Sequence, residues 1–128
     1  MKYLRKYRLL ENIDLENQFI DACKNGNLET AKKLISKVNP SVADNYAIQL
    51  AAQNGHLEVV RLLLRDDRVD PSAGNNSAIR VATKKGYEEV VYLLLNHPKV
   101  YDTLTKEERD KYAKGRMLYI DILKKLNK

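Results

Sequence analysis

Apolar residues along this chain recur at helical spacing in short segments that come in pairs. The clearest pair lies in residues 45–64, NYAIQLAAQNGHLEVVRLLL, where small apolar residues run up to Gly55 and a second apolar stripe follows. Glycine takes the left-handed conformation after a helix without steric cost, so Gly55 predicts the end of the first helix. Glu58 lies in the first turn of the second helix, where a carboxylate suits the dipole. The stretch predicts two short antiparallel helices, with Asp44 and Asn45 as N-cap candidates for the first.

The same pattern recurs on both sides, in residues 19–35 and 78–95. Two helices this short do not stay folded alone, so the three pairs are expected to stack on one another. The glycines that end the first helices of the pairs, Gly26, Gly55 and Gly86, are separated by 29 residues (26 to 55) and 31 residues (55 to 86). An alanine in each first helix recurs at the same two intervals: Ala22, Ala51 and Ala82.

A period near ~33 residues, with a turn and two antiparallel helices per unit, is typical of ankyrin repeats. The middle unit, LAAQNGHLEVVRLLL, resembles the ankyrin consensus almost residue for residue. The resemblance implies an all-α fold, a solenoid of three repeats with helical N-terminal and C-terminal caps. The Asn-x-Ala-Ile openings and the Arg-Val-Asp-Pro-Ser linker resemble the short ankyrin arrays encoded by giant DNA viruses of amoebae.

One feature of the consensus is missing. The Thr-Pro-Leu-His opening of the family is replaced by residues 46–49, YAIQ, and by residues 77–80, SAIR. The resemblance gives that histidine the role of bridging neighbouring repeats. Its absence predicts looser coupling between the repeats.

The pattern divides one domain, residues 1–128, into five units. Residues 1–14 carry apolar side chains at helical spacing among lysines and arginines, and they predict either a helix that caps the first repeat or a basic arm. Asp14 is the N-cap candidate of the helix that follows. The expected units are an N-terminal cap helix over 1–14, repeat 1 over 15–44, repeat 2 over 45–75, repeat 3 over 76–102, and a degenerate fourth repeat or C-terminal cap over 103–128.

The C-terminal unit begins with a capping box, Thr105 to Glu108, which predicts a helix over 106–113. Gly115 follows Gly86 by 29 residues (86 to 115), and Ile120 then takes the place of Val91 in repeat 3. The inner half of this unit is too polar to be covered on both sides. It therefore suits an end unit.

The amino-acid composition indicates the cellular compartment in which the protein is expected. The single cysteine, Cys23, excludes an intrachain disulfide framework and favours a reducing environment, and its place beside Ala22 predicts a small buried packing residue. No stretch reaches the roughly 18–20 apolar residues that cross a bilayer, and the N-terminal residues lack the apolar region of a secretory signal. An intracellular, cytoplasmic protein without membrane association is expected, in the host cytoplasm for a viral protein.

Catalytic and metal-binding patterns are missing from the sequence. The two histidines, His56 and His97, lie far apart in the repeats, so with one cysteine they form no zinc-type cluster. His56 is predicted to cap and pack at a turn, and His97 to lie at the end of a helix, where a cation would suit the dipole. No phosphate-binding loop or nucleophile motif occurs. We expect no enzyme activity, no metal and no cofactor.

The resemblance implies a protein–protein interaction module that binds through the tips of the turns and the exposed inner-helix residues. The whole chain has a net charge of +6, and none of the candidate positions is acidic, so they form a mildly basic surface that favours a protein partner with an acidic surface. Nucleic-acid or anionic-surface binding is the alternative, disfavoured because no basic run exceeds two residues. Self-association is a further alternative to the expected monomer. The candidate partner-binding residues are Lys24, Asn25, Val42, Ala43, Asn45, Gln53, Asn54, Ala73, Gly74, Asn76, Arg80, Lys84 and Lys85.

Overall fold

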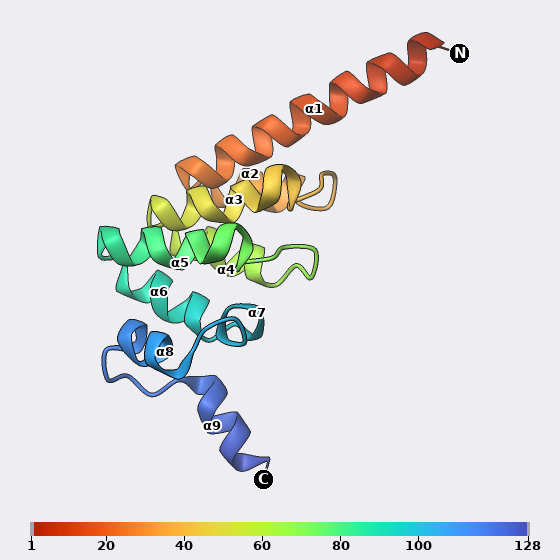
Figure 1. Ribbon diagram of the computed structural model, residues 1–128. Helices are drawn as coiled ribbons and strands as arrows, with labels where there is room; N and C mark the ends of the chain where they lie inside the picture. Colours follow the sequence, from red (N-terminus) through yellow and green to blue (C-terminus); the bar gives the residue numbers. More distant parts are fainter. Residues whose placement is uncertain (1, 128) are drawn as a thin grey trace.

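The computed structural model describes the backbone of residues 2–127 and the side chains of residues 6–127. Within that part of the chain the regular elements are all helices, as the sequence predicts, and they stack into an elongated solenoid with the two chain ends at opposite tips (Figure 1). In chain order they are α1 (Lys2–Asn25), α2 (Leu28–Leu34), α3 (Val42–Gln53), α4 (Leu57–Leu64), α5 (Ala73–Lys85), α6 (Glu88–Leu95), α7 (Pro98–Tyr101), α8 (Lys106–Ala113) and α9 (Tyr119–Leu126).

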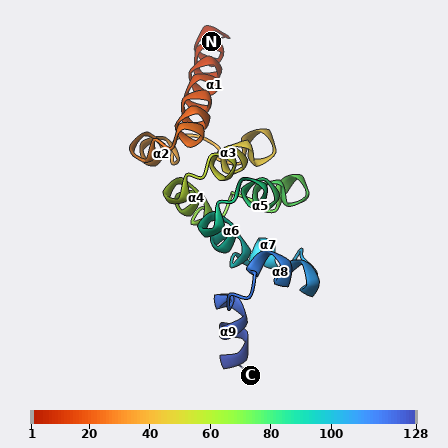
Figure 2. The ribbon, with the colours of Figure 1, turned by 90° about the vertical axis from the view of Figure 1, so that its left-hand side faces the viewer.

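The first six helices form three pairs, each turning at a glycine. Gly26, Gly55 and Gly86 have φ of 74°, 71° and 80°, a conformation that costs a residue with a Cβ about 1–2 kcal/mol. The inner helices α1, α3 and α5 pack side by side in one layer, and the outer helices α2, α4 and α6 form a second layer (Figure 2). The predicted helix pairs and glycine turns are therefore present.

Small residues let the inner helices approach one another. Ala51 and Ala82 are fully buried, and Ala22 is nearly so. Cys23 is buried beside them, and burial raises the pKa of its thiol to about 12, because a low-dielectric surrounding disfavours the thiolate. The thiol stays protonated, and Cys23 serves as a small packing residue.

Residues 2–25 form one continuous helix, whereas the sequence predicts a separate cap helix over 1–14. Asp14 lies in the middle of α1, where its carboxylate accepts a hydrogen bond from the Gln18 side chain (2.9 Å), and it caps no helix. No glycine or proline interrupts the segment, so one helix runs through it. The N-terminal half of α1 projects beyond the stack and does not cover the first repeat (Figure 1).

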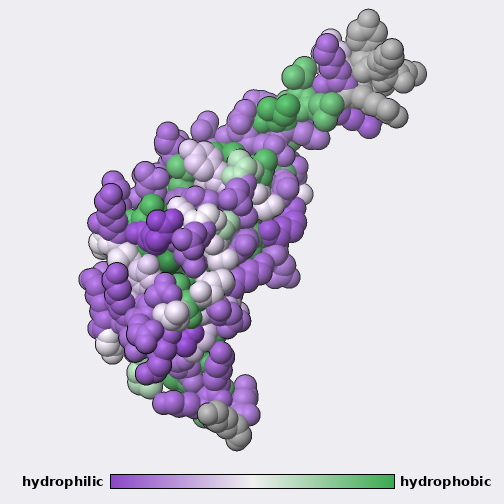
Figure 3. Space-filling model, viewed as in Figure 1, coloured by the Kyte–Doolittle hydropathy of each residue, from purple (hydrophilic) through white to green (hydrophobic). Residues whose placement is uncertain are grey.

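The projecting half of α1 leaves a group of apolar side chains in solvent. Tyr7, Leu10 and Ile13 are each more than half exposed, and they lie roughly opposite the buried Phe19 and Ala22 around the helix. The apolar stripe of α1 thus changes sides along its length. Figure 3 shows this hydrophobic area on the projecting helix.

Left-handed turns open the second and third inner helices. Residues 43–45 and 74–76 all have φ between 55° and 65°. Asn45 was an N-cap candidate, but its Oδ1 accepts a hydrogen bond from the backbone N–H of Asp70 (2.8 Å) in the next linker. Asn76 makes the corresponding link with the opposite role, since its Nδ2 donates to the Thr103 hydroxyl (2.9 Å). Both asparagines link a repeat to the following unit, so the N-cap prediction for Asn45 is wrong.

The positions of the missing consensus histidine also make contacts. The Gln49 side chain donates to the carbonyl oxygen of Asp44 (2.8 Å), and the Arg80 guanidinium donates to the carbonyl oxygens of Asn75 (3.0 Å) and Gly74 (3.1 Å). Each side chain ties its own left-handed turn to its own helix. The two asparagine bridges, in contrast, run between neighbouring units.

The C-terminal unit follows the repeat pattern only as far as Gly115. Helix α8 has the predicted bounds and capping box, and Gly115 is left-handed (φ 82°). Helix α9 then begins four residues after Gly115, whereas α6 begins two residues after Gly86. It does not pair with α8 and turns away from the stack (Figure 2). Ile120 is only half-buried and does not reproduce the role of Val91, so the fourth unit is a repeat in its first half alone.

Candidate functional site

The predicted partner-binding residues lie at the two opposite ends of the inner helices. The C-terminal ends of α1, α3 and α5 lie one below another at the left of Figure 1, and the turns that open α3 and α5 lie at the right. The structure therefore separates the residues into two rows. The C-terminal row is Lys24, Asn25, Gln53, Asn54, Lys84 and Lys85, and the turn row is Val42, Ala43, Asn45, Ala73, Gly74 and Asn76, with Arg80 beside it.

The turn row offers little to a partner. Asn45 and Asn76 are only 7% exposed and hold the repeats together, so their assignment to a binding surface is wrong. The Arg80 guanidinium is engaged by two carbonyl oxygens of its own turn. The exposed residues Ala43 and Gly74 present only a methyl group and backbone.

The C-terminal row carries positive charge. Lys24, Lys84 and Lys85 are exposed, and none of the three forms an ion pair with another described side chain. Cations at helix C-termini are favoured by the helix dipole, which helps to keep them there. This row is the part of the predicted site that remains available to a partner.

A stacked ring covers the glycine turn of each of the first two repeats. A Cβ placed on Gly26 would lie 2.5 Å from Nδ1 of His56, and one on Gly55 would lie 2.8 Å from the Tyr87 ring. His56 and Tyr87 each directly follow the glycine of the next repeat. His56 Nε2 also donates a hydrogen bond to the Lys24 carbonyl oxygen (2.9 Å). His56 thus packs as predicted, but its side chain makes no capping bond to α4.

The third glycine turn has no ring above it. A Cβ placed on Gly86 would meet no atom within 4 Å. The residue in the equivalent place is Arg116, which follows Gly115. Its guanidinium carbon lies 3.7 Å from the centroid of the Tyr92 ring, and Nη1 lies 3.2 Å from Glu89 Oε1. Arg116 has turned to the outer helix and left the space over Gly86 open.

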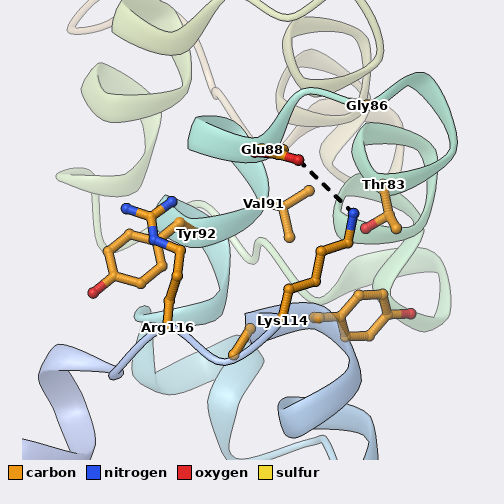
Figure 4. Close-up of a pocket in the computed structure, with 9 residues that line it drawn as sticks. Thr83, Gly86, Glu88, Val91, Tyr92, Lys114 and Arg116 are labelled. Atoms are coloured by element: carbon orange, nitrogen blue, oxygen red, sulfur yellow. Dashed lines mark ion pairs between the residues drawn. The ribbon is translucent and has the colours of Figure 1, made fainter.

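A cavity of about 310 Å³ occupies this space, between the α5–α6 turn and residues 112–116 (Figure 4). Val91, Tyr92 and Ala113 contribute apolar lining, and Lys114 reaches across it with Nζ 3.9 Å from Glu88 Oε1. Sequence reasoning missed this cavity. The available signal was the register of the residues that follow the glycines, which places an arginine where the preceding repeats have rings.

His97 is the N-cap of α7 and not a cation at the end of α6. Its Nδ1 accepts a hydrogen bond from the Lys99 backbone N–H (3.2 Å), which requires an unprotonated nitrogen. Burial, together with the nearby Lys99 charge, lowers the pKa of His97. His97 therefore does not supply the cation that would suit the dipole of this helix end.

The variant His97→Asn should lose part of the pH dependence of stability. Because the pKa of His97 is lower in the folded chain than the usual 6.5, the unfolded chain binds the proton first as pH falls. The free energy of unfolding then decreases as pH falls from about 6.5 through the folded pKa, by about 1.4 kcal/mol for each unit of the shift. Asparagine caps helices without titrating. Urea unfolding of both chains between about pH 7 and pH 5 measures the difference; the same decrease in both chains would contradict the prediction.

Neither a metal-ion cluster nor a membrane-spanning helix occurs among the described residues. Among their side chains, no three histidine, cysteine, aspartate or glutamate groups lie close enough together to hold a metal ion. Across residues 2–127, no helix has the length and apolar character needed to cross a bilayer.

Stacked helix pairs with glycine turns and a repeating register define a helical-repeat solenoid. The family model "Ankyrin repeats (3 copies)" matches residues 19–105, more than half of the chain. The chain belongs to the ankyrin repeat family, whose repeats are generally non-catalytic protein–protein interaction modules. Comparison with curated proteins and with solved structures finds no match.

Proposed function

We propose that this protein is a non-catalytic interaction module that binds an acidic protein partner through the C-terminal row of its inner helices. The observation that carries the proposal is the series of exposed cations Lys24, Lys84 and Lys85 at the ends of α1 and α5. Acidic residues contribute nothing to this row. A partner with carboxylates at matching spacing would be attracted to the two charged ends of the row, at α1 and α5.

Charge complementarity of this kind acts mainly on the encounter rate and on the choice of partner. The stacked alanines hold the inner helices together, and hydrogen bonds from Asn54 (3.2 Å) and His56 (2.9 Å) to the Lys24 carbonyl oxygen fix the end of α1, so little ordering of the scaffold accompanies binding. The proposal involves no cofactor and no reaction. The single buried thiol suits a reducing compartment, so the proposal places the protein in the cytoplasm. It also includes the likeness to giant-virus arrays, which would make that compartment the cytoplasm of an amoebal host.

The paired substitution Lys84→Glu with Lys85→Glu should abolish partner binding and leave stability nearly unchanged. Both side chains are exposed at the end of α5, and surface substitutions usually change the free energy of unfolding by no more than about 0.5 kcal/mol. The matched control is Lys32→Glu with Lys33→Glu, which makes the same charge change on the outer helix α2. A partner captured from host-cell lysate by the unmodified chain is purified, and its affinity for both variants is measured.

The control pair separates the proposal from nucleic-acid or anionic-surface binding. A general attraction would weaken equally in both variants and fade as salt shortens the Debye length to ~8 Å. A docked protein partner should respond mainly to the Lys84 and Lys85 pair. Equal losses of affinity from the two pairs would overturn the assignment of the lysine row.

Self-association is the second candidate, favoured by the exposed apolar side chains of α1. Two copies that cross antiparallel at Leu10 would cover these side chains and bring Lys6 of one copy level with Asp14 of the other. Sedimentation equilibrium should then show a mass that rises with concentration in the unmodified chain and stays at the monomer value in Leu10→Ser with Ile13→Ser. A monomer at every concentration of the unmodified chain would exclude this candidate.

A further inference from the structure

We propose that the cavity over Gly86 receives an aromatic side chain of a partner polypeptide, with acidic residues on either side of it in the partner. This inference rests on the proposed function, because it names the segment of an acidic partner that the module would anchor. Three features of the chain lead to it: the precedent in its own repeats, the apolar lining of the cavity, and the charges at its mouth.

The chain itself shows what fits over these glycine turns. The His56 ring lies on Gly26 and the Tyr87 ring lies on Gly55, each in contact distance of the position where a Cβ would be. Gly86 has the same left-handed backbone, and its turn has the same place for a planar ring. Arg116 does not fill that place, since it lies against Tyr92. An aromatic ring from another chain would complete the pattern.

The lining of the cavity suits a ring more than a charged group. Val91, labelled in Figure 4, is a buried lining residue. Ala113, the last residue of α8, also lines the cavity. A volume of about 310 Å³ lies at the lower end of the range of small-ligand pockets and exceeds the volume of one aromatic side chain. Burial of an aromatic side chain against apolar walls is a common anchor at protein interfaces.

The mouth of the cavity is positively charged on balance. The ion pairs from Lys114 to Glu88 (3.9 Å) and from Arg116 to Glu89 (3.2 Å) are both exposed to solvent, and such pairs contribute little. A carboxylate of a partner can therefore share or replace these contacts at small cost. Among the charged residues that line the cavity, Lys114 and Arg116 outnumber Glu88, and Lys84 and Lys85 end α5 directly before Gly86.

The test is an NMR titration of the full ¹⁵N-labelled chain with the peptide acetyl-Glu-Tyr-Glu-amide. We expect saturable shifts at the amides of Gly86, Val91 and Ala113, and nuclear Overhauser contacts between the tyrosyl ring and the Gly86 α-protons. Acetyl-Gln-Tyr-Gln-amide lacks the charges and acetyl-Glu-Ala-Glu-amide lacks the ring. Each should bind about tenfold more weakly, the difference expected from losing two exposed ion pairs or one anchoring ring.

The variant Arg116→Tyr is expected to block binding of the peptide at Gly86. Its own ring can take the place over Gly86, as Tyr87 does over Gly55, so the peptide contacts at Gly86 should disappear. The control Arg65→Tyr makes the same substitution at the exposed end of α4 and should leave them intact. The dispersion of the spectrum shows directly that both variants are folded.

The outcomes separate this inference from the proposed function. Shifts scattered over surface lysines, contacts that persist in Arg116→Tyr, or no saturable response at millimolar peptide would overturn the cavity proposal. If the Lys84 and Lys85 pair still abolishes partner binding in that case, the proposed function stands. If the peptide binds at Gly86 but the two lysine-pair variants lose partner affinity equally, the assignment of the lysine row is rejected and the cavity proposal is kept.

Discussion

Removal of residues 103–128 is expected to leave a chain that aggregates or loses helicity. Helix α8 packs against α6, and Leu104, Ala113 and Leu118 join the same buried core as Val91 and Leu94. The deletion would expose that flank of α6, and a fully buried valine or leucine contributes about 1.5–3 kcal/mol relative to an exposed one. Uncovered ends of helical-repeat solenoids are also sticky, because they present the apolar surface made for a further repeat.

A shorter deletion serves as the control. Removal of residues 119–128 takes away α9, which has no buried residue, and retains Leu118. That chain should stay helical and show only a modest fall in melting temperature. Circular dichroism and sedimentation velocity compare the two. If the chain without 103–128 stays monomeric and melts like the full chain, the C-terminal unit is an appendage and not a cap.

The second large effect is expected from Gly55→Ala. Gly55 has φ of 71°, where an alanine is strained by about 1–2 kcal/mol. Its Cβ would also lie 2.8 Å from atoms of the Tyr87 ring, so this exposed ring must shift, which adds to the loss. The free energy of unfolding should therefore fall by more than the backbone strain of about 1–2 kcal/mol alone.

Gly86→Ala isolates the contribution of the ring. Gly86 has a similar φ of 80° but no atom within 4 Å of an added Cβ, so only the backbone strain applies. Its expected loss is about 1–2 kcal/mol. Urea unfolding measures both variants, and Tyr87→Ala in the Gly55→Ala background should remove part of the larger loss. Equal losses from the two glycine variants would show that the ring does not restrict Gly55.

The features that could be predicted from the sequence depend on neighbours along the chain. A left-handed glycine ends a helix wherever it stands, so the turns at Gly26, Gly55 and Gly86 are present as predicted. The capping box of Thr105 and Glu108 is equally local, and α8 has its predicted bounds. The common register of the alanines indicated their burial because repeats of one sequence pattern stack in one way.

The candidate site was only partly predictable, because exposure depends on what the folded chain places nearby. Lys84 and Lys85 are exposed at the end of α5 as expected. Asn45 and Asn76 stand in equally polar, turn-like sequence, yet their side chains reach linkers 25 and 27 residues further along the chain. Hydrogen bonds between residues so far apart leave no local signal. Resemblance to the family could therefore place the turns but not the direction of their side chains.

The sequence by itself determined the helix pairs, their glycine turns and the repeat register, since each follows from short-range backbone preferences and apolar spacing. The continuity of α1 follows from a sequence without glycine or proline, but only the tertiary structure decided that its N-terminal half extends beyond its last neighbour in the stack. It also decided where the Arg116 side chain lies. That residue has the register of His56 and Tyr87, but the Tyr92 ring and the Glu89 carboxylate together hold its guanidinium on the outer helix. The Arg116 side chain can lie either over Gly86 or against Tyr92 and Glu89, and three-dimensional packing decides for the second. The cavity over Gly86 is the result.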